Sequence, residues 1–403
     1  MIVTINRAEF LDAAKRAASI APAESPLDVL KGALMEADAA SGKLTITSTN
    51  MEVALVEKLP CSVQEEGSLV FSAKMLTEML QRLPLDTVQI SRPENQGRTA
   101  LRSENACYEV DVWDRGAFPK PDLPFPEDTV KLSGIPAMAQ RTVFATAQDN
   151  NKPLLKCVNL KFTDVGLRAA GSNGSCIVTA KGDDQSKGDI SMLIPATSLG
   201  KLARMCADKD EFRVGTTGKN IVFFKENFLF SARLMEGGYI DTDLLLSTIK
   251  NSFTVLTDIQ DMRNALASVL TVEPEGKVKL SFKDQRLKFY CGGKYGTASA
   301  PVDVIALTGA PAGDYWFSSR QLGTCLKALT GTVTLGIASG GMLTLSTQDA
   351  YYIQSAMRAP TEKKAAKAAR AIGDPYYLSL LRRRGPSGSR SQGLRACGEA
   401  AGH

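Results

Sequence analysis

The side chains that most often carry enzyme chemistry are sparse and ungrouped in this chain. The only histidine is His403, which excludes Ser-His-Asp and Cys-His catalysis and histidine-ligated metals from the rest of the sequence. No phosphate-binding glycine loop is present, and no pattern groups the carboxylates into an acid/base pair or a metal site. We therefore expect no catalytic residue, no metal, no cofactor and no enzymatic activity.

The cysteines also lack a reactive spacing. They are Cys61, Cys107, Cys157, Cys176, Cys206, Cys291, Cys325 and Cys397. No two lie closer than 19 residues, so no CxxC pair for zinc or redox chemistry exists. Because most lie in apolar stretches, we expect buried, reduced thiols.

Basic side chains form the one pattern with a chemical meaning. Eleven of them fall on six predicted helices: Arg7, Lys15, Arg16, Lys74, Arg82, Arg141, Lys201, Arg204, Arg263, Arg320 and Lys327. Only four acidic residues share these helices, an excess of seven positive charges, whereas the rest of residues 1–359 has an excess of eight negative charges. Basic helices of this kind are expected where a polyanion binds, although the charges of any one helix could simply solvate its outer face.

Hydrophobic periodicity indicates where these charges point. On the last predicted helix, Leu322, Cys325 and Leu326 belong to an inward stripe, and Arg320 and Lys327 fall outside it. The helices carry no aromatic platform for stacking bases and no Asn, Gln and Arg set for reading base edges. Contact with phosphates, independent of sequence, is therefore expected.

The elements that carry these charges occur three times. The segments 71–76, 194–199 and 317–322 each begin a short amphipathic helix that leads into a strand, and they are 123 residues apart. Each repeat opens with a strand that leads into a helix (residues 5–18, 132–145 and 256–270) and closes with a hairpin (98–113, 220–234 and 341–357). This pattern predicts three α+β domains with two helices and antiparallel strands each, over residues 1–120, 128–246 and 251–359.

Composition bounds the setting of these domains. With 403 residues, 44% hydrophobic and 23% charged, the chain is typical of a soluble globular protein. It has no apolar run near 20 residues and no signal peptide is expected, so we predict a cytoplasmic protein without membrane contact. The proline-rich residues 116–126 read as an extended linker.

The end of the sequence belongs to no repeat. Residues 360–403 hold nine basic residues against three acidic ones, which accounts for the net charge of +5 because residues 1–359 sum to −1. We expect this tail to be mostly disordered and to add salt-sensitive affinity for DNA, although an appendage without a role explains its composition equally well.

Several stretches, in order and spacing, resemble the bacterial DNA polymerase III beta subunit, the sliding clamp. Residues 44–52 (LTITSTNME) are similar to the family's L-x-x-T-x-T-D-L-E, and residues 234–241 (LMEGGYID) to L-x-x-G-x-F/Y-P-D. Phe118-Pro119 matches a Phe-Pro after the first domain, and residues 356–359 resemble the family's Met-Pro-Met-Arg-Leu ending. The resemblance covers residues 1 to about 359.

The resemblance implies a head-to-tail homodimeric ring of six DNA-clamp domains, with twelve helices around duplex DNA and the sheets outside. Such a ring would act as a processivity factor that tethers the replicative polymerase and the clamp loader through short peptide motifs. It implies a dimer interface in which Tyr108 and Val110 meet Val269 and Leu270 of the second copy, although a core role for these four is an alternative.

The resemblance also implies a peptide-binding groove between the second and third domains. Its residues here would be Leu155, Ser172, Gly174, Ser175, Cys176, Ile177, Ile240, Leu244, Leu245, Gln321, Met342, Ile353, Ser355, Ala356, Met357 and Arg358. The chain departs from the family there: residues 172–177 read SNGSCI where the family has Thr-Asp-Gly-His-Arg-Leu, and Ile240 and Leu244 replace a proline and a basic residue.

Two other functions are compatible with these residues. A clamp-fold adaptor could bind peptides without encircling DNA, and the altered groove and the tail agree with it. An enzyme acting on DNA would need a carboxylate or lysine centre, and the sequence nominates none. The oligomeric state separates the first of these from a ring.

Overall fold

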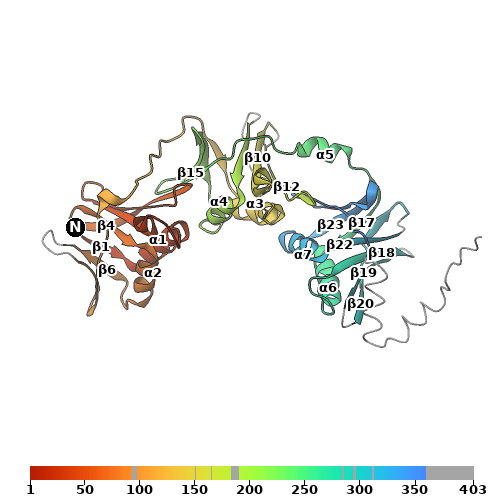
Figure 1. Ribbon diagram of the computed structural model, residues 1–403, viewed down its shortest axis with the longest axis horizontal. Helices are drawn as coiled ribbons and strands as arrows, with labels where there is room; N and C mark the ends of the chain where they lie inside the picture. The colour runs from red at the N-terminus through yellow and green to blue at the C-terminus, as the bar shows by residue number, and fades with distance from the viewer. Residues whose placement is uncertain are drawn as a thin grey trace, which may run out of the picture.

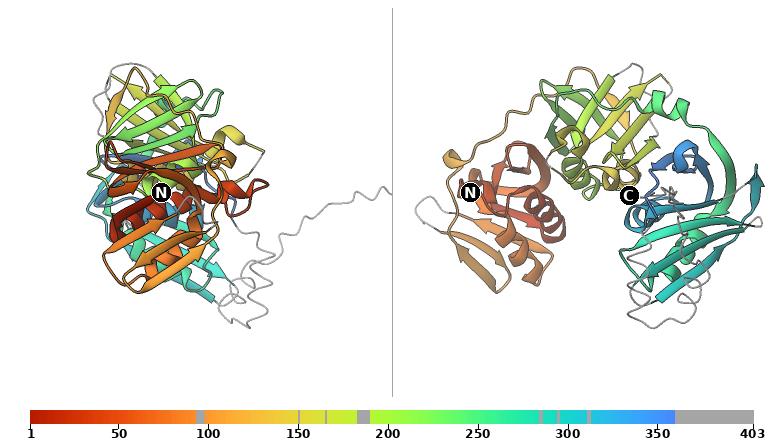
Figure 2. Two further views of the ribbon diagram at one scale, coloured as in Figure 1. Left: turned by 90° about the vertical axis from the view of Figure 1, so that its left-hand side faces the viewer. Right: turned by 45° about the vertical axis from the view of Figure 1, so that its right-hand side comes forward.

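The structure is a computed structural model that describes residues 1–92, 98–149, 151–164, 166–182, 190–283, 286–293, 296–310 and 313–359. Within these residues, three α+β domains follow one another along an arc (Figure 1). Six helices lie on the concave side of the arc and the sheets lie on its convex side, and the turned views of Figure 2 show the same arrangement.

The described residues of the first domain form two α-helices and eight strands, besides two short 3-10 helices. In chain order they are β1 (Ile2–Asn6), α1 (Arg7–Ile20), β2 (Gly32–Asp38), β3 (Lys43–Thr49), β4 (Val53–Glu65), β5 (Gly67–Ser72), α2 (Ala73–Arg82), β6 (Thr87–Ser91), β7 (Thr99–Ser103) and β8 (Ala106–Val110). The helices pack side by side over a core that includes Phe10, Leu76 and Leu80, all fully buried.

The second domain repeats this order. Its elements are β9 (Val130–Leu132), α3 (Ile135–Thr142), β10 (Cys157–Thr163), β11 (Gly166–Ser172), β12 (Cys176–Lys181), β13 (Ile190–Pro195), α4 (Ala196–Ala203), β14 (Phe212–Thr217), β15 (Asn220–Lys225) and β16 (Phe228–Arg233). On α4, Leu199 and Leu202 are buried, but the helix ends before Cys206, so this thiol lies in the following turn and is only half-buried. The apolar stripe of α4 therefore includes Leu199 and Leu202 and does not reach Cys206.

The third domain repeats the order once more and adds one strand, β21. Its elements are β17 (Asn251–Asp258), α6 (Ile259–Leu270), β18 (Lys277–Lys283), β19 (Arg286–Gly293), β20 (Gly296–Val302), β21 (Ala306–Thr308), β22 (Gly313–Ser318), α7 (Ser319–Ala328), β23 (Thr332–Ala338), β24 (Leu343–Ser346) and β25 (Ala350–Gln354). The predicted stripe on α7 is confirmed, because Leu322, Cys325 and Leu326 are all buried.

Corresponding caps start the corresponding helices. Ser72 and Ser318 each accept a hydrogen bond from the backbone of the first turn of α2 and α7, which satisfies one of the free amide groups at a helix N-terminus. The residue at the same place before α4 is Pro195, and α4 has no side-chain cap. The three repeats thus share the fold without sharing every local stabilising contact.

Neighbouring domains join through continuous sheets. Strand β16 of the second domain pairs antiparallel with β4 of the first, and Phe228 faces Glu57. Strand β25 of the third domain pairs in the same way with β12 of the second, and Ala350 faces Ala180. Each joint covers two sheet edges that would otherwise expose unpaired backbone groups.

A seventh helix, α5 (Thr242–Thr248), was not predicted from the sequence. It lies in the connection between the second and third domains, on the convex side (Figure 1). The Asp241 side chain caps it by accepting from Asp243 and Leu244 backbone N–H groups. Because Leu244 remains 63% exposed, the helix has no buried apolar stripe that periodicity could reveal.

Both connections are held to the sheets by ion pairs at corresponding positions with reversed charge. In the first, Glu36 on β2 pairs with Lys120 at 2.7 Å and with Arg115 at 3.0 Å. In the second, Lys161 on β10 pairs with Asp243 at 2.9 Å. Glu36 and Lys161 occupy the same place in their repeats, so the chain anchors both connections at one position of the sheet.

The cysteines of the described residues are all free thiols. Cys157, Cys176, Cys291 and Cys325 are buried as expected, whereas Cys107 on the edge strand β8 is exposed and corrects that expectation; Cys397 lies outside the described residues. In the part of the chain that the structure describes, no helix is long and apolar enough to span a membrane.

Candidate functional site

The concave side of the arc carries a set of free cations. Because the helices pack against the sheets, their exposed faces lie toward the concave side (Figure 1). Six of the eleven predicted basic residues are exposed there: Lys15, Lys74, Arg82, Arg204, Arg320 and Lys327. Lys15 lies 3.4 Å from Asp12, and the side chains of the other five make no hydrogen bond or ion pair with the described residues. Free guanidinium and ammonium groups of this kind can bind phosphates.

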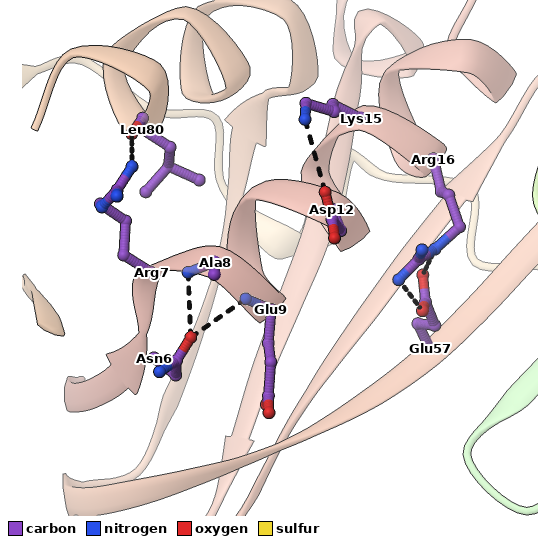
Figure 3. A network of polar contacts seen from close by, with 9 residues as sticks. All are labelled: Asn6, Arg7, Ala8, Glu9, Asp12, Lys15, Arg16, Glu57 and Leu80. Carbon is purple, nitrogen blue, oxygen red and sulfur yellow. Dashed lines mark hydrogen bonds and ion pairs between the residues drawn. The ribbon is translucent and has the colours of Figure 1, made fainter. Parts of the chain in front are cut away.

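Two of the predicted cations instead complete the helix pairs. Arg7 donates to the carbonyl oxygen of Leu85 at 2.7 Å and to that of Leu80 at 3.2 Å (Figure 3). Arg263 donates to Leu326 O at 2.7 Å and to two further carbonyls just beyond it. In the first and third domains an arginine of the first helix thus satisfies free carbonyls at the end of the second helix. These two guanidinium groups hold the scaffold, which corrects their prediction as free DNA contacts.

Arg16 and Arg141 are also engaged within the protein. Arg16 binds Glu57 on β4 through two parallel hydrogen bonds of 2.7 and 2.9 Å (Figure 3), and Glu57 is buried. Arg141 reaches Asp349 in the β24–β25 turn of the third domain at 3.5 Å. These contacts link a helix to a sheet and one domain to the next, so neither side chain is free for a ligand.

Lys201 has an intermediate position on α4. Burial lowers its pKa, the neighbouring Arg204 lowers it further, and Glu52 acts in the opposite direction. Its half-buried ammonium can therefore contribute to the potential of the concave side without projecting far from it.

The predicted partner groove lies at the joint of β12 and β25. Ser175, in the turn between β11 and β12, accepts a hydrogen bond from Gln321 of α7 at 2.8 Å, and its carbonyl accepts from Ser355 N at 2.9 Å. Met357 then pairs with Trp316. The second and third domains therefore contribute to one surface, on which Met357 is an exposed apolar side chain; Leu244 of α5, in the connection between them, is exposed as well.

Three of the predicted groove residues lie beneath this surface. Ser172, Cys176 and Ile353 are 0%, 2% and 5% exposed, because they belong to the paired strands of the joint. The burial of Cys176 raises its thiol pKa to about 11. These side chains can shape the groove from below, but their prediction as direct peptide contacts is corrected. The other thirteen are at least partly accessible.

The four residues predicted at the dimer interface also differ in how accessible they are. Tyr108 and Val110 lie on β8, whose outer edge is unpaired within the described residues, and both are half-buried. Val269 is 0% exposed in the core of the third domain, so its prediction as an interface residue is wrong for this structure. Leu270 is half-buried against the same core.

Sequence reasoning missed Glu57 and Asp243. Glu57 neutralises Arg16, and Asp243 binds both Lys161 and Arg168 to hold α5. No local signal could have found them, since Glu57 is 41 residues from Arg16 and Asp243 is 82 from Lys161.

Comparisons with known proteins agree with this arrangement. The family model for the DNA polymerase III beta subunit, N-terminal domain, matches residues 1–123, and the model for the central domain matches residues 129–241. The beta sliding clamp of Bacillus subtilis is 24% identical over 301 residues, 70% of this chain and 78% of that protein.

Solved structures extend the likeness to the third domain. The DNA polymerase sliding clamp from Bacillus subtilis has a TM-score of 0.80 at 20% identity, covering 89% of this chain and 100% of that one. A sliding clamp from Pseudomonas aeruginosa bound to griselimycin also has a TM-score of 0.80 at 20% identity, covering 89% of this chain and 100% of that one. Three α+β domains joined edge to edge along an arc, with helices inside, define the DNA-clamp fold. The chain belongs to the bacterial DNA polymerase III beta subunit family, which confirms the resemblance drawn from its motifs.

Proposed function

We propose that two copies of this chain close into a ring that encircles duplex DNA, slides along it and tethers the replicative polymerase. The observation that carries the proposal is the placement of free cations on the concave side of the arc and of sheets on the convex side. A polyanion threaded through such a ring would be held by its phosphates without base contacts, so the ring could move along any sequence.

The repeat itself supports how the ring closes. Inside the chain, the last strand of one domain pairs with a strand of the domain before it: β16 with β4, and β25 with β12. The corresponding strands without a partner at this position are β8 and β20. In a head-to-tail dimer, β8 of each copy would pair with β20 of the other copy. These two seams would have the geometry of the internal joints and would close six domains into a ring.

The internal joints also give the register of this seam. Glu57 and Ala180, which face Phe228 and Ala350, correspond to Ala300 on β20. Phe228 and Ala350 each come directly after a two-residue hairpin turn, at the start of the last strand of their domain. Ala106 has the same place at the start of β8, so it corresponds to them. Ala300 would therefore face Ala106 of the second copy.

That register matches the side chains of the two edges. Continuing it places Tyr108 opposite Ala298 and Val110 opposite Gly296, on the half-buried face of both strands. The small residues of β20 leave room for the larger ones of β8. On the exposed face, Cys107 would meet Ser299 of the second copy.

The groove between the second and third domains would bind short, extended peptides of the polymerase and the clamp loader. Exposed Leu244 and Met357 offer apolar contacts, and Ser175 and Gln321 offer neutral hydrogen-bonding groups. The His-Arg pair that the family usually carries is absent, so we expect a preference for apolar over acidic peptides. The role is tethering through effective concentration rather than catalysis.

Retention on DNA circles tests the ring. Protein loaded on a nicked circle should stay bound through gel filtration and should leave when the circle is cut once. Equal loss from circular and linear DNA, or a stable 43.2 kDa monomer at micromolar concentration, would contradict the ring and favour a peptide-binding adaptor. The basic tail, residues 360–403, lies outside the described residues; deleting it tests whether it adds salt-sensitive DNA affinity.

A further inference from the structure

The turn that shapes the predicted partner groove has a copy at the joint of the first and second domains. In the groove turn, Asn173 Oδ1 accepts from the backbone N–H groups of Ser175 and Cys176, both at 2.9 Å. In the copy, Asn50 Oδ1 accepts from Glu52 N at 3.1 Å and from Val53 N at 2.7 Å. The threonine before this asparagine, like the corresponding serine, bonds across the turn in both directions.

The tip of the copied turn exposes a methionine. Met51 has a φ of 73° and occupies the place of Gly174, whose φ is 87°. A side chain in the left-handed region is strained, and an unbranched apolar residue is rarely found there. Met51 is nevertheless 64% exposed. Neither burial of its side chain nor a preference for this backbone conformation therefore explains a methionine at this site.

The opposite wall is copied as well. Arg233 N donates to Glu52 O at 2.9 Å, as Ser355 N does to Ser175 O at 2.9 Å. Two residues further on, Met235 bridges to Leu193, as Met357 bridges to Trp316. Met235 and Met357 are both 39% exposed. The same backbone framework therefore presents a methionine on this wall of both joints.

A depression follows these walls. A cavity of about 660 Å³ is lined by Glu52, Lys156, Arg233 and Met235, among other residues. A smaller one of about 230 Å³ shares Glu52 and is lined by Met51 and by Leu123 of the first connection. Because they share Glu52, we treat the two cavities as one groove that runs from α4 across the joint to the first connection.

The two grooves differ in charge. In the larger cavity of the copied joint, Arg233 is exposed on one wall and Lys156 is half-buried beside it, with Glu52 as the one carboxylate among the lining residues; the smaller cavity adds Lys120 and Asp122. Ser355, Gly276 and Ser175 stand at the corresponding places of the partner groove and carry no charge, whereas the cations of that groove are Lys152, whose ammonium lies beside Gly174, and the predicted groove residue Arg358. Cations next to exposed methionines complement a ligand that combines a carboxylate with an apolar residue.

We propose that the joint of the first and second domains is a second docking groove, for an extended acidic peptide with an apolar anchor. The anchor would lie between Met51 and Met235, and a carboxylate of the peptide would bind Arg233. This site goes beyond the proposed function, which assigns a partner only to the joint of the second and third domains. One chain would then select two classes of peptide by the same fold and different charges.

Selection from a random nonapeptide phage library on the full-length protein tests the proposal. We expect two groups of peptides: neutral apolar ones that Met357→Ala weakens, and acidic apolar ones that it leaves unchanged. By fluorescence anisotropy, Arg233→Glu should weaken the acidic group about tenfold or more and leave the first group unaffected. Recovery of peptides that all depend on Met357 and none on Arg233 would overturn the second groove and leave the ring proposal intact.

A glycine variant separates binding from folding. Met51→Gly removes the strained side chain, so it should leave the melting temperature unchanged or higher while weakening the acidic peptides severalfold. If Met51→Gly and Arg233→Glu both fold and both keep full affinity for every selected peptide, the groove has no docking role.

Discussion

At the scale of single residues, exposure separates two kinds of basic side chain that look alike in the sequence. Lys15 and Arg16 are neighbours on α1, yet Lys15 is exposed and Arg16 is bound in two hydrogen bonds to the buried Glu57. The side chains of Arg16 and Glu57 are 28% and 9% exposed. A charge-assisted pair with so little water around it contributes more than a surface pair.

Replacing Arg16 should therefore destabilise the first domain. Arg16→Ala leaves the carboxylate of Glu57 buried and unpaired, and we expect a loss of about 1–3 kcal/mol in the free energy of unfolding. Lys15→Ala is the matched control and should change it by less than about 0.5 kcal/mol. Urea unfolding measures both, and equal effects of the two substitutions would show that the pair with Glu57 carries no special stability.

The thiols should differ in reactivity for the same reason. Burial raises the pKa of Cys176 to about 11 and is the main cause that raises that of Cys206 to about 12. At pH 8 the reactive thiolate is therefore scarce at both sites. Among the cysteines of the described residues, iodoacetamide should modify the exposed Cys107 first, as peptide mass spectrometry can show. Modification of Cys176 in the folded protein before Cys107 would contradict the burial described for the joint.

At the scale of elements, the basic side chains of the helix pair α6 and α7 divide into one that holds the two helices together and two that face solvent. Arg263 of α6 closes the carbonyl end of α7, whereas Arg320 and Lys327 of α7 remain exposed. Counting charges along the sequence assigns Arg263 to the DNA-binding surface, whereas its hydrogen bonds show that it joins α6 to α7. DNA affinity should depend on the exposed members, and stability on the bound one.

The double variant Arg320→Ala, Lys327→Ala should loosen DNA without unfolding the domain. Each lost phosphate contact removes about 0.9 from the slope of log affinity against log salt. Retention on nicked circles should therefore fall and its salt dependence flatten, with an unchanged melting temperature. Lys219→Ala, beside β15 on the sheet side, is the control. An unaltered salt slope in the double variant would argue against contact between α7 and phosphates.

At the scale of the whole molecule, the internal joints are the template for the joint between copies. Strand β8 at one end and β20 at the other have free edges within the described residues, and the chain already contains two examples of how such edges pair. The register inferred from them can be checked chemically because Cys107 is a native exposed thiol on β8.

The single substitution Ser299→Cys should join two copies by disulfides. Directly opposed residues of antiparallel strands have the Cα separation that a disulfide requires. Oxidation should give a covalent dimer in non-reducing gels, and on circular DNA the doubly linked ring should survive denaturation. Thr297→Cys, two residues out of register, should link far less. Efficient linking of Thr297→Cys and none of Ser299→Cys would mean that the seam has another register.

The sequence by itself determined the three repeats, their α+β content and most of their helices, because spacing, caps and apolar stripes are local properties. It also carried the motifs of the family. It did not determine which cations are free or how α5 is held, because these depend on residues such as Glu57 and Asp243 that are distant from their partners along the chain. Tertiary structure alone decided the joints, where paired strands cover Cys176 and place Met51 and Met235 in two cavities that share Glu52. Contacts of this kind arise only when separate domains meet, and no periodicity within one segment encodes them.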